Sequence, residues 1–397
     1  MKIKKVLLIS SLYKPNIGGV EITIGQMAQH LRADGIETVV LTKRFPKVLS
    51  EFEVIDGVPV HRIDRPQSDE QFHNIITEIL SNEPALRADI VHIIGIRRPM
   101  PLLGLLLAKR WKVPYVVTFA GGDLPQNEDQ ESVKIWSEGV DTVPSSVNQA
   151  DCWTAFSTST AKLASELLGD NMKPLIVYGG IDLKSISEAK PMSIGNPYFF
   201  IARRIEKSKG IDILIKAFSL ICNQLPDVSL IIAGEGSERE ELERLSNELG
   251  LGNKVRFLGF IDPTTVFSYM KGSIAHICPS RSESGGLVNY ESQASGCLTI
   301  GSDADGIPEY ISDGKTGILF KSGDIDGLAQ KLLLAARNDQ HIRDIKKAAI
   351  ESSRDHGWET FTKNYIGIYR DLIMKNLSRR FKPWSKLTER LARQMDI

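Results

Sequence analysis

Apolar, β-branched runs alternate with amphipathic helical stretches along nearly the whole chain. The first run is KKVLLISS, followed by VEITIGQMAQHL with apolar residues at helical spacing, and then by TVVLT, ADIVHIIG and PYVVTFAGG. Such runs are typical of parallel strands buried on both faces, with helices covering the sheet. The sequence therefore predicts an α/β fold of the doubly wound, Rossmann-like type.

The alternation pauses once and then starts again. Residues 184–197, KSISEAKPMSIGNP, are polar and contain two prolines and a glycine, which is typical of a linker. Beyond them the strand-like runs are YFFIARR, VSLIIAGEG, KVRFLGF, IAHICPS, CLTIGSD and TGILF. Because 397 residues suffice for two cores, we expect Rossmann-like domains over 1–183 and 184–357, then a helix over 358–375 and a tail over 376–397.

Composition excludes several classes of protein. The net charge is zero, which gives no signal for a nucleic-acid partner. The four cysteines form no C-x-x-C pair, so we expect buried thiols in a reducing compartment, without disulfides or metal ligation. The apolar run near the start is short and predicts a first strand, and PLLGLLLA is too short to cross a bilayer. We expect a cytoplasmic protein.

The tail over 376–397 differs from the rest of the chain. From Lys375 to Ile397 there are seven basic and two acidic residues. One helical stripe is apolar and is flanked by cations: Trp384, Leu387, Leu391 and Met395, beside Lys386, Arg390 and Arg393. A basic amphipathic helix binds an anionic membrane surface, and packing on the protein itself or on a second subunit explains the pattern equally well.

Two glycine turns follow strands and precede helices. In IGGVE, Gly18 and Gly19 allow a ligand to approach the backbone, and the following helix directs free N–H groups towards an anion. In IIAGEGSERE, Gly234 and Gly236 occupy the same kind of position. A plain tight turn explains either motif nearly as well, and neither is the G-x-G-x-x-G dinucleotide fingerprint.

The stretch ARRIEKSKG places three cations after the first strand of the second domain. Arg203, Arg204 and Lys209 would lie beyond the carboxyl end of that strand, where ligands bind in such sheets. A departing diphosphate gains negative charge and needs cations of this kind, which makes a metal unnecessary. The alternative is a solvated basic loop.

The stretch SESGGLVNYE contains two glutamates with seven residues between them. Gly285, Gly286 and Leu287 would place amides at a helix N-terminus, where phosphate binds. Glu291 would lie one to two turns inside that helix, and its carboxylate suits the cis-diol of a ribose. Glu283, in the loop, suits a sugar hydroxyl. A surface glutamate pair is less consistent with the apolar runs on both sides.

Taken together, these motifs resemble a glycosyltransferase of the GT-B fold, namely the retaining family four, also called glycosyl transferases group 1. The resemblance runs from GGVE through ARRIEKSKG, AGEGSE and ESGGLVNYE to GIPEYISDGKTGILF, and covers nearly the whole chain. The helix WETFTKNYIGIYRDL, within 358–375, resembles the one that crosses back to the first domain in this fold.

The resemblance implies roles for the residues of these motifs. Arg203 and Lys209 would hold the donor diphosphate, with Arg204 as a rival for the arginine role. Glu283 would contact the donor sugar, and Glu291 would bind the ribose. The further donor contacts that it implies are Gly18, Gly19, Gly234, Gly236, Gly285, Gly286 and Leu287, with Phe257 and Leu258 framing the base. Glu21 and Asp123 are expected on the acceptor side.

One position departs from the family pattern. Many relatives have a histidine after a strand of the first domain, where this chain has Ala120 in TFAGGD. Some relatives manage without it, since the leaving phosphate can take the acceptor proton; the alternative is an inactive chain. Asp123 is a candidate acceptor-side contact, and His92 is expected to be a buried strand histidine.

The resemblance implies a metal-independent, retaining transferase without a cofactor. It would move a sugar from a nucleotide sugar, with UDP expected, to a hydroxyl acceptor in polysaccharide or glycolipid synthesis. The alternatives are a GT-B phosphorylase or epimerase, or an inactive nucleotide-sugar-binding subunit. The sequence predicts peripheral contact with the inner face of the membrane only through the tail.

Overall fold

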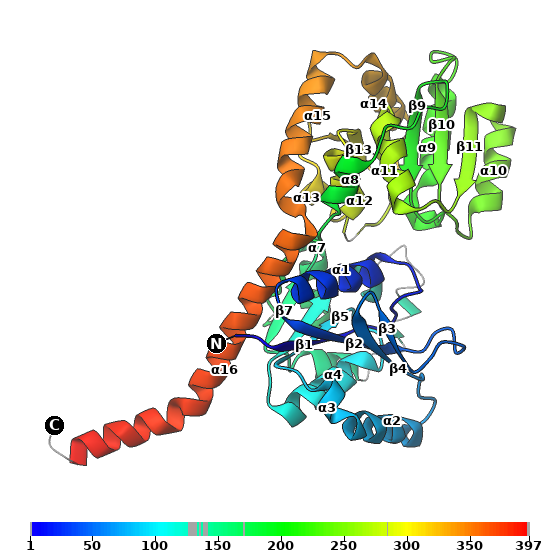
Figure 1. Cartoon of the computed structure of the whole chain (residues 1–397). Helices are drawn as coiled ribbons and strands as arrows, with labels where there is room; N and C mark the ends of the chain where they lie inside the picture. Colours follow the sequence, from blue (N-terminus) through cyan, green and yellow to red (C-terminus); the bar gives the residue numbers. More distant parts are fainter. Residues whose placement is uncertain are drawn as a thin grey trace.

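The computed structural model describes residues 2–394 except 126–132, 135, 138–141, 170 and 284. The side chains of residue 69 and of residues 377–394 lie outside this description. Two α/β domains are built around separate sheets, which confirms the expected fold class. Figure 1 shows one domain above the other, with the helix that begins at Trp358 starting between them and running along the first domain.

The first domain contains an eight-stranded sheet in the order β3-β4-β2-β1-β5-β6-β7-β8. Its strands are β1 (Lys5–Ile9), β2 (Glu37–Lys43), β3 (Phe52–Ile55), β4 (Val58–Ile63), β5 (Ile90–Ile94), β6 (Tyr115–Phe119), β7 (Cys152–Ala155) and β8 (Leu175–Ile176). Its helices are α1 (Gly19–Ala33), α2 (Asp69–Ser81), α3 (Glu83–Leu86), α4 (Met100–Trp111), α6 (Val143–Val147) and α7 (Thr158–Leu168). Every strand pair except β3–β4 is parallel.

The second domain contains a six-stranded parallel sheet in the order β11-β10-β9-β12-β13-β14. Its strands are β9 (Tyr198–Ala202), β10 (Ser229–Ala233), β11 (Val255–Gly259), β12 (Ala275–Cys278), β13 (Leu298–Ser302) and β14 (Ile318–Phe320). Its helices are α8 (Leu183–Glu188), α9 (Ile211–Ile221), α10 (Arg239–Glu248), α11 (Pro263–Gly272), α12 (Leu287–Ala294), α13 (Ile307–Tyr310), α14 (Ile325–Arg337) and α15 (Gln340–Ser353).

Two segments differ from the pattern expected of a purely alternating chain. The β3–β4 pair is an antiparallel hairpin at one edge of the first sheet, turning at Asp56 and Gly57, which both have positive φ. Residues 184–197 are not simply a polar linker, because their first part belongs to α8, which begins at Leu183 and buries Ile186 against the second domain. Both elements are short, so they carry little periodicity in the sequence.

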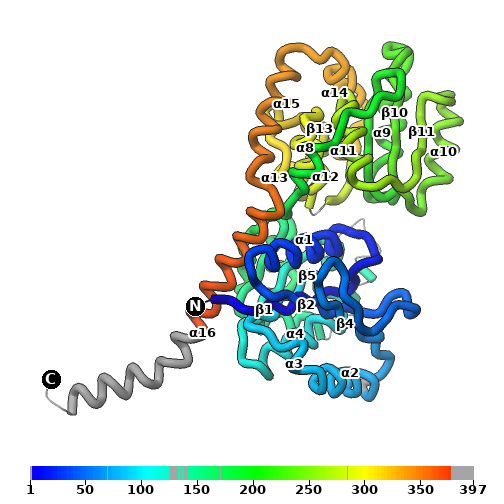
Figure 2. The backbone as a smooth tube through the Cα atoms, in the orientation of Figure 1, coloured from blue at the N-terminus to red at the C-terminus, as the bar shows by residue number. Residues whose placement is uncertain are grey.

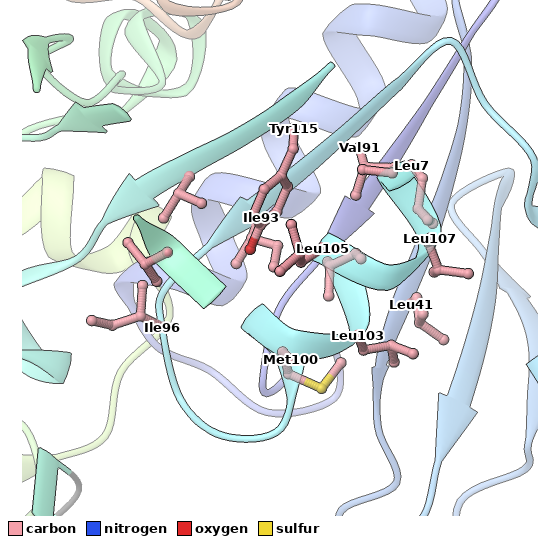
Figure 3. Packing of buried hydrophobic residues seen from close by; sticks show 14 of the residues in the cluster. Leu7, Leu41, Val91, Ile93, Ile96, Met100, Leu103, Leu105, Leu107 and Tyr115 are labelled. Carbon is pink, nitrogen blue, oxygen red and sulfur yellow. The ribbon is translucent and has the colours of Figure 1, made fainter. Parts of the chain in front are cut away.

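The core of the first domain lies on both faces of its sheet. Figure 3 shows one side, where Leu7, Leu41 and Val91 of three parallel strands pack with Leu103 and Leu107 of α4. The other side is covered by α1 and by α16 (Trp358–Gln394), which follows the last helix of the second domain. The last helix therefore completes the core of the first domain.

His92 anchors α16 to the centre of the first sheet. The residue is fully buried on β5, as expected from the sequence. Its Nδ1 lies 2.6 Å from the Tyr369 hydroxyl and its Nε2 lies 2.6 Å from Thr118 Oγ1. The Tyr365 hydroxyl lies 3.0 Å from Oγ1 of both Thr118 and Thr154. Burial lowers the pKa of His92 to about 3, so the ring is neutral and donates one hydrogen bond while accepting another.

The predicted tail falls on the last part of α16. The backbone is helical to Gln394, but the apolar stripe Trp384, Leu387, Leu391 and Met395 lies outside the described side chains. Within the described part of the chain, no helix is both long enough and apolar enough to cross a bilayer.

We expect Tyr369→Phe to lower the free energy of unfolding of the first domain by about 1–3 kcal/mol, because it leaves one buried nitrogen of His92 without a partner. Denaturant titration of wild type and of Tyr369→Phe measures this loss. Met374→Ala is the control, since Met374 is 58% exposed on the same helix and its loss should change stability by less than about 0.5 kcal/mol. Equal stability of the two variants would show that the network does not hold α16.

Candidate active site between the two domains

A cavity of about 390 Å³ lies between the domains, at the carboxyl ends of their parallel strands. The first domain contributes the turns after β1, β5 and β6 and the start of α1. The residues that line the cavity from this domain include Gly18, Gly19, Glu21, Arg97, Ala120, Asp123 and Phe156. The second domain contributes Arg204, Gly285, Leu287 and Tyr310. Residues predicted from two separate halves of the sequence therefore meet at one site.

Three of the predicted residues form a buried ion cluster in the second domain; none of them lines the cavity, but Arg204, next to Arg203 in the chain, does. Arg203 follows β9 directly, Lys209 ends the 3-10 turn before α9, and Glu283 follows β12. The Glu283 carboxylate is paired with the Arg203 guanidinium, and its Oε2 lies 3.2 Å from Lys209 Nζ. The side chains are only 8%, 10% and 15% exposed for Arg203, Glu283 and Lys209. Burial alone would raise the pKa of Glu283, but the two cations outweigh it and hold the pKa below its ordinary value.

The loop that carries Glu283 is fixed by the turn before α13. Asp305 Oδ2 accepts hydrogen bonds from the Glu283 amide at 3.0 Å and from Ser282 Oγ at 2.8 Å. The Gly306 amide donates to the Glu283 carbonyl at 2.9 Å. Both the amide and the carbonyl of Glu283 are therefore held by hydrogen bonds, which fixes the backbone that carries the buried carboxylate.

Neighbouring arginines point to different places. Arg203 turns inward, where its Nη1 lies 2.7 Å from Cys278 Sγ and its Nη2 contacts Glu283. Arg204 is exposed and lines the cavity. The two candidates for the arginine role are thus separated: Arg203 reaches the ion cluster and Arg204 reaches the open space.

Glu291 lies one turn inside α12 in a different electrostatic environment. Burial, and then the nearby Asp182 carboxylate, raise the pKa of Glu291 to about 7. Among the described residues, none donates a hydrogen bond to this carboxylate. Its surroundings thus push the pKa of Glu291 in the direction opposite to that of Glu283. Glu291 is available to accept hydrogen bonds from a ligand.

The two glycines of the same motif have different surroundings. A Cβ atom on Gly286 would lie 2.3 Å from Asn289 Nδ2, so a larger residue there would have to displace the end of the Asn289 side chain. A Cβ atom on Gly285 would meet only the Tyr310 hydroxyl at 3.7 Å and Phe156 Cβ at 4.0 Å, which are ordinary contacts. Gly285 therefore leaves room in the cavity rather than relieving a clash.

The glycine pair of the first domain opens α1, with Gly18 as its N-cap residue. The Glu21 carboxylate lies over this end of the helix. It is so close to Gly18 that a Cβ atom on this glycine would lie 2.3 Å from Glu21 Oε2. Burial is the main cause that raises the pKa of Glu21. A carboxylate thus lies at the helix end where a phosphate was expected, and an incoming phosphate would have to displace it.

Asp123 lines the cavity with both carboxylate oxygens engaged. Its Oδ1 accepts from Arg97 Nε at 2.7 Å and its Oδ2 accepts from the Ile96 amide at 2.8 Å. Ala120, in place of the family histidine, also lines the cavity and is 6% exposed. Asp123 therefore fixes Arg97 in the turn after β5, in addition to any contact with an acceptor.

Gly234 and Gly236 have internal reasons to be glycine. A Cβ atom on Gly234 would lie 1.9 Å from the Arg203 carbonyl oxygen, and one on Gly236 would lie 2.2 Å from that of Ile205. These glycines allow the turn after β10 to pack against the turn after β9. Neither residue lines the cavity.

Phe257 and Leu258 lie on β11, the edge strand of the second sheet, and do not line the cavity either. Both side chains are half-buried against the second domain. Their contact with a base stays a prediction, as do the donor contacts of Gly234 and Gly236.

Sequence reasoning missed Arg97, Phe156 and Tyr310, which all line the cavity. The run IGIRRP after β5 contained the same signal as ARRIEKSKG, namely arginines following a buried strand. Phe156 and Tyr310 carried no such signal, because they meet only through the packing of one domain on the other.

Comparison with known proteins gives matches over both domains. Residues 18–179 match the family model described as glycosyl transferase 4-like domain, and residues 184–352 match that of glycosyl transferases group 1. Phosphatidyl-myo-inositol mannosyltransferase of Mycobacterium leprae is 26% identical over 89% of this chain and 92% of its own length. D-inositol 3-phosphate glycosyltransferase of Jonesia denitrificans is 27% identical over 89% of this chain and 91% of its own.

Solved structures resemble this one in fold. Sucrose-phosphate synthase from Thermosynechococcus elongatus superimposes with a TM-score of 0.78 at 20% identity, covering 94% of this chain and all of that one. HepE from Anabaena, solved in complex with UDP, gives a TM-score of 0.75 at 19% identity, covering 93% of this chain and all of that one. Both likenesses extend over the two domains together.

Proposed function

Because the chain belongs to the group 1 glycosyltransferases and has the GT-B fold, we propose that it transfers a sugar from a nucleotide diphosphate sugar to a hydroxyl acceptor with retention of configuration. The donor that we propose is a UDP-sugar. The observation that carries the proposal is the buried cluster of Glu283, Arg203 and Lys209, since Arg204, the chain neighbour of Arg203, lines the interdomain cavity. Glu291 supports it, since its carboxylate has no partner among the described residues.

The second domain would bind the donor through this cluster. During transfer the bond from the anomeric carbon to the diphosphate oxygen breaks, and its electron pair leaves with the diphosphate. Lys209 and Arg203 would stabilise the charge that develops there, so the reaction would need neither a metal nor a cofactor. Glu283 would orient the two cations and contact the donor sugar, while Glu291 would accept hydrogen bonds from the ribose hydroxyls.

The first domain would bind the acceptor across the same cavity. The acceptor oxygen would form the new bond to the anomeric carbon on the face that the diphosphate leaves, and its proton would pass to the leaving phosphate. This route needs no histidine at position 120, where the chain has alanine. Glu21, Arg97 and Asp123 line the cavity from the first domain and would bind the hydroxyl groups of the acceptor.

The acceptor that we propose is a glycolipid or a cell-surface polysaccharide precursor, and the name of one relative, a mannosyltransferase of a phosphatidyl-inositol, supports the glycolipid. One relative is a phosphatidyl-myo-inositol mannosyltransferase and another is a D-inositol 3-phosphate glycosyltransferase. A lipid-linked acceptor would place the enzyme at the inner face of the cytoplasmic membrane, held there by the basic tail over 376–397.

Ala120 favours a second candidate, a subunit that binds the nucleotide sugar without turning it over. Donor binding without transfer and without hydrolysis would support that alternative. A GT-B phosphorylase or epimerase is a third reading, and cleavage of a disaccharide by phosphate in the absence of a nucleotide would support it.

We expect Lys209→Ala to slow release of nucleotide from a donor panel of UDP-, GDP- and ADP-sugars about a hundredfold, on the order of 3 kcal/mol in the barrier, because the leaving diphosphate loses one cation. Lys207→Ala, an exposed lysine in the same turn, is the control and should turn over like wild type. Thermal melting of both variants separates loss of catalysis from loss of folding. An unchanged turnover of folded Lys209→Ala would remove Lys209 from the mechanism.

We expect deletion of residues 376–397 to abolish binding to vesicles that contain anionic lipids, because six of the seven cations counted above are lost with it. Flotation with anionic and with neutral vesicles measures the effect. Neutral vesicles are the control, since they should bind neither protein. Binding of the truncated protein to anionic vesicles would contradict the role of the tail.

A further inference from the structure

A carboxylate of the second domain caps a helix of the first domain. Glu309 lies in α13, and its Oε2 and Oε1 accept hydrogen bonds from the amides of Thr158 at 2.7 Å and Ser159 at 2.9 Å. These amides open α7, whose own N-cap residue, Ser157, accepts a hydrogen bond from the Thr160 amide at 3.1 Å. The first turn of α7 thus depends on the other domain for an anionic partner.

Neighbouring groups strengthen the same contact. The Tyr310 hydroxyl donates to the Phe156 carbonyl at 2.9 Å, and the Tyr178 hydroxyl donates to Glu309 Oε2 at 3.3 Å. Phe156 and Tyr310 also line the interdomain cavity. The contact between α13 and α7 therefore forms one wall of the candidate active site.

The covalent connections between the domains leave a rotation open. The chain passes between them twice, and the two crossings lie side by side (Figures 1 and 2). The Ile181 amide donates to the His356 carbonyl at 2.8 Å, and the Trp358 amide donates to the Ile181 carbonyl at 3.3 Å. Hinges of this kind are a few residues where the chain passes between domains, so contacts away from the crossings are the ones that fix the angle.

The same short segment also reaches the ion cluster. Asp305 and Gly306, directly before α13, hold the amide and the carbonyl of Glu283. A displacement of α13 relative to α7 would therefore change both the width of the cavity and the position of Glu283.

We propose that Glu309 is a positioning residue that pins the two domains at a fixed angle by capping α7, and so sets the cavity in which transfer takes place. The part concerning transfer rests on the proposed function, whereas the part concerning domain angle does not. Glu309 touches no reacting atom in this account and acts through α7 and through the segment 305–310.

The test compares Glu309→Ala and Glu309→Gln with Glu248→Gln, an exposed glutamate of the same domain. Hydrogen–deuterium exchange at the Thr158 and Ser159 amides reports the cap, and small-angle scattering reports the domain angle. Turnover of a UDP-sugar panel gives kcat and KM separately. Thermal melting identifies any variant that fails to fold, and Glu309→Gln remains usable if Glu309→Ala does.

For Glu309→Ala we expect exchange at both amides to rise about tenfold, as loss of a charge-assisted hydrogen bond predicts. The radius of gyration should increase, and kcat should fall at least about tenfold while KM for the donor is unchanged, because donor contacts lie in the second domain. Glu309→Gln retains one acceptor and should lie between Glu309→Ala and the control.

Faster exchange with unchanged scattering and unchanged kcat would overturn the proposal, since Glu309 would then be a helix cap only. Unchanged exchange would overturn it as well. If wild type turns over none of the donors, the proposed transferase function fails. Hydrogen–deuterium exchange and small-angle scattering would still decide whether Glu309 fixes the angle between the domains.

Discussion

The buried carboxylate of Glu283 is the group on which the candidate site depends. It binds Arg203, which directly follows β9, and Lys209, from the turn before α9, so three loops meet at one charge. Removing three charges from water is costly, and only close pairing with further hydrogen bonds compensates for it. The cluster keeps one net positive charge, which suits a site that receives a diphosphate.

The surroundings of Glu283 connect this charge to the rest of the molecule. Asp305 and Gly306 fix its peptide unit, and the same segment continues into α13, where Glu309 caps α7 of the other domain. Glu291 lies in the same motif with its pKa raised to about 7 rather than lowered. Glu283 is therefore paired with two protein cations, whereas Glu291 has no hydrogen-bond partner among the described residues.

Much of this arrangement could be predicted from the sequence, because strand ends in a parallel sheet meet at one edge. That rule alone brings Arg203, Lys209 and Glu283 together. It does not say which of two adjacent arginines turns inward, nor that Gly234 and Gly236 are required by neighbouring carbonyls. Phe156 and Tyr310 could not be predicted, since their contact depends on how one domain packs on the other.

If Glu291 and the ion cluster form a donor site, a nucleotide binds at SESGGLVNYE without a metal. Calorimetric titration with UDP, GDP and ADP in EDTA, on wild type, Glu291→Ala and the control Glu248→Ala, measures this binding. One nucleotide should bind wild type and the control, and Glu291→Ala should lose roughly 2–4 kcal/mol, as two lost charge-assisted hydrogen bonds predict. Binding should also weaken as the pH falls below about 7, where Glu291 takes up a proton. Absence of binding by all three nucleotides, or equal binding by Glu291→Ala and wild type, would contradict the account.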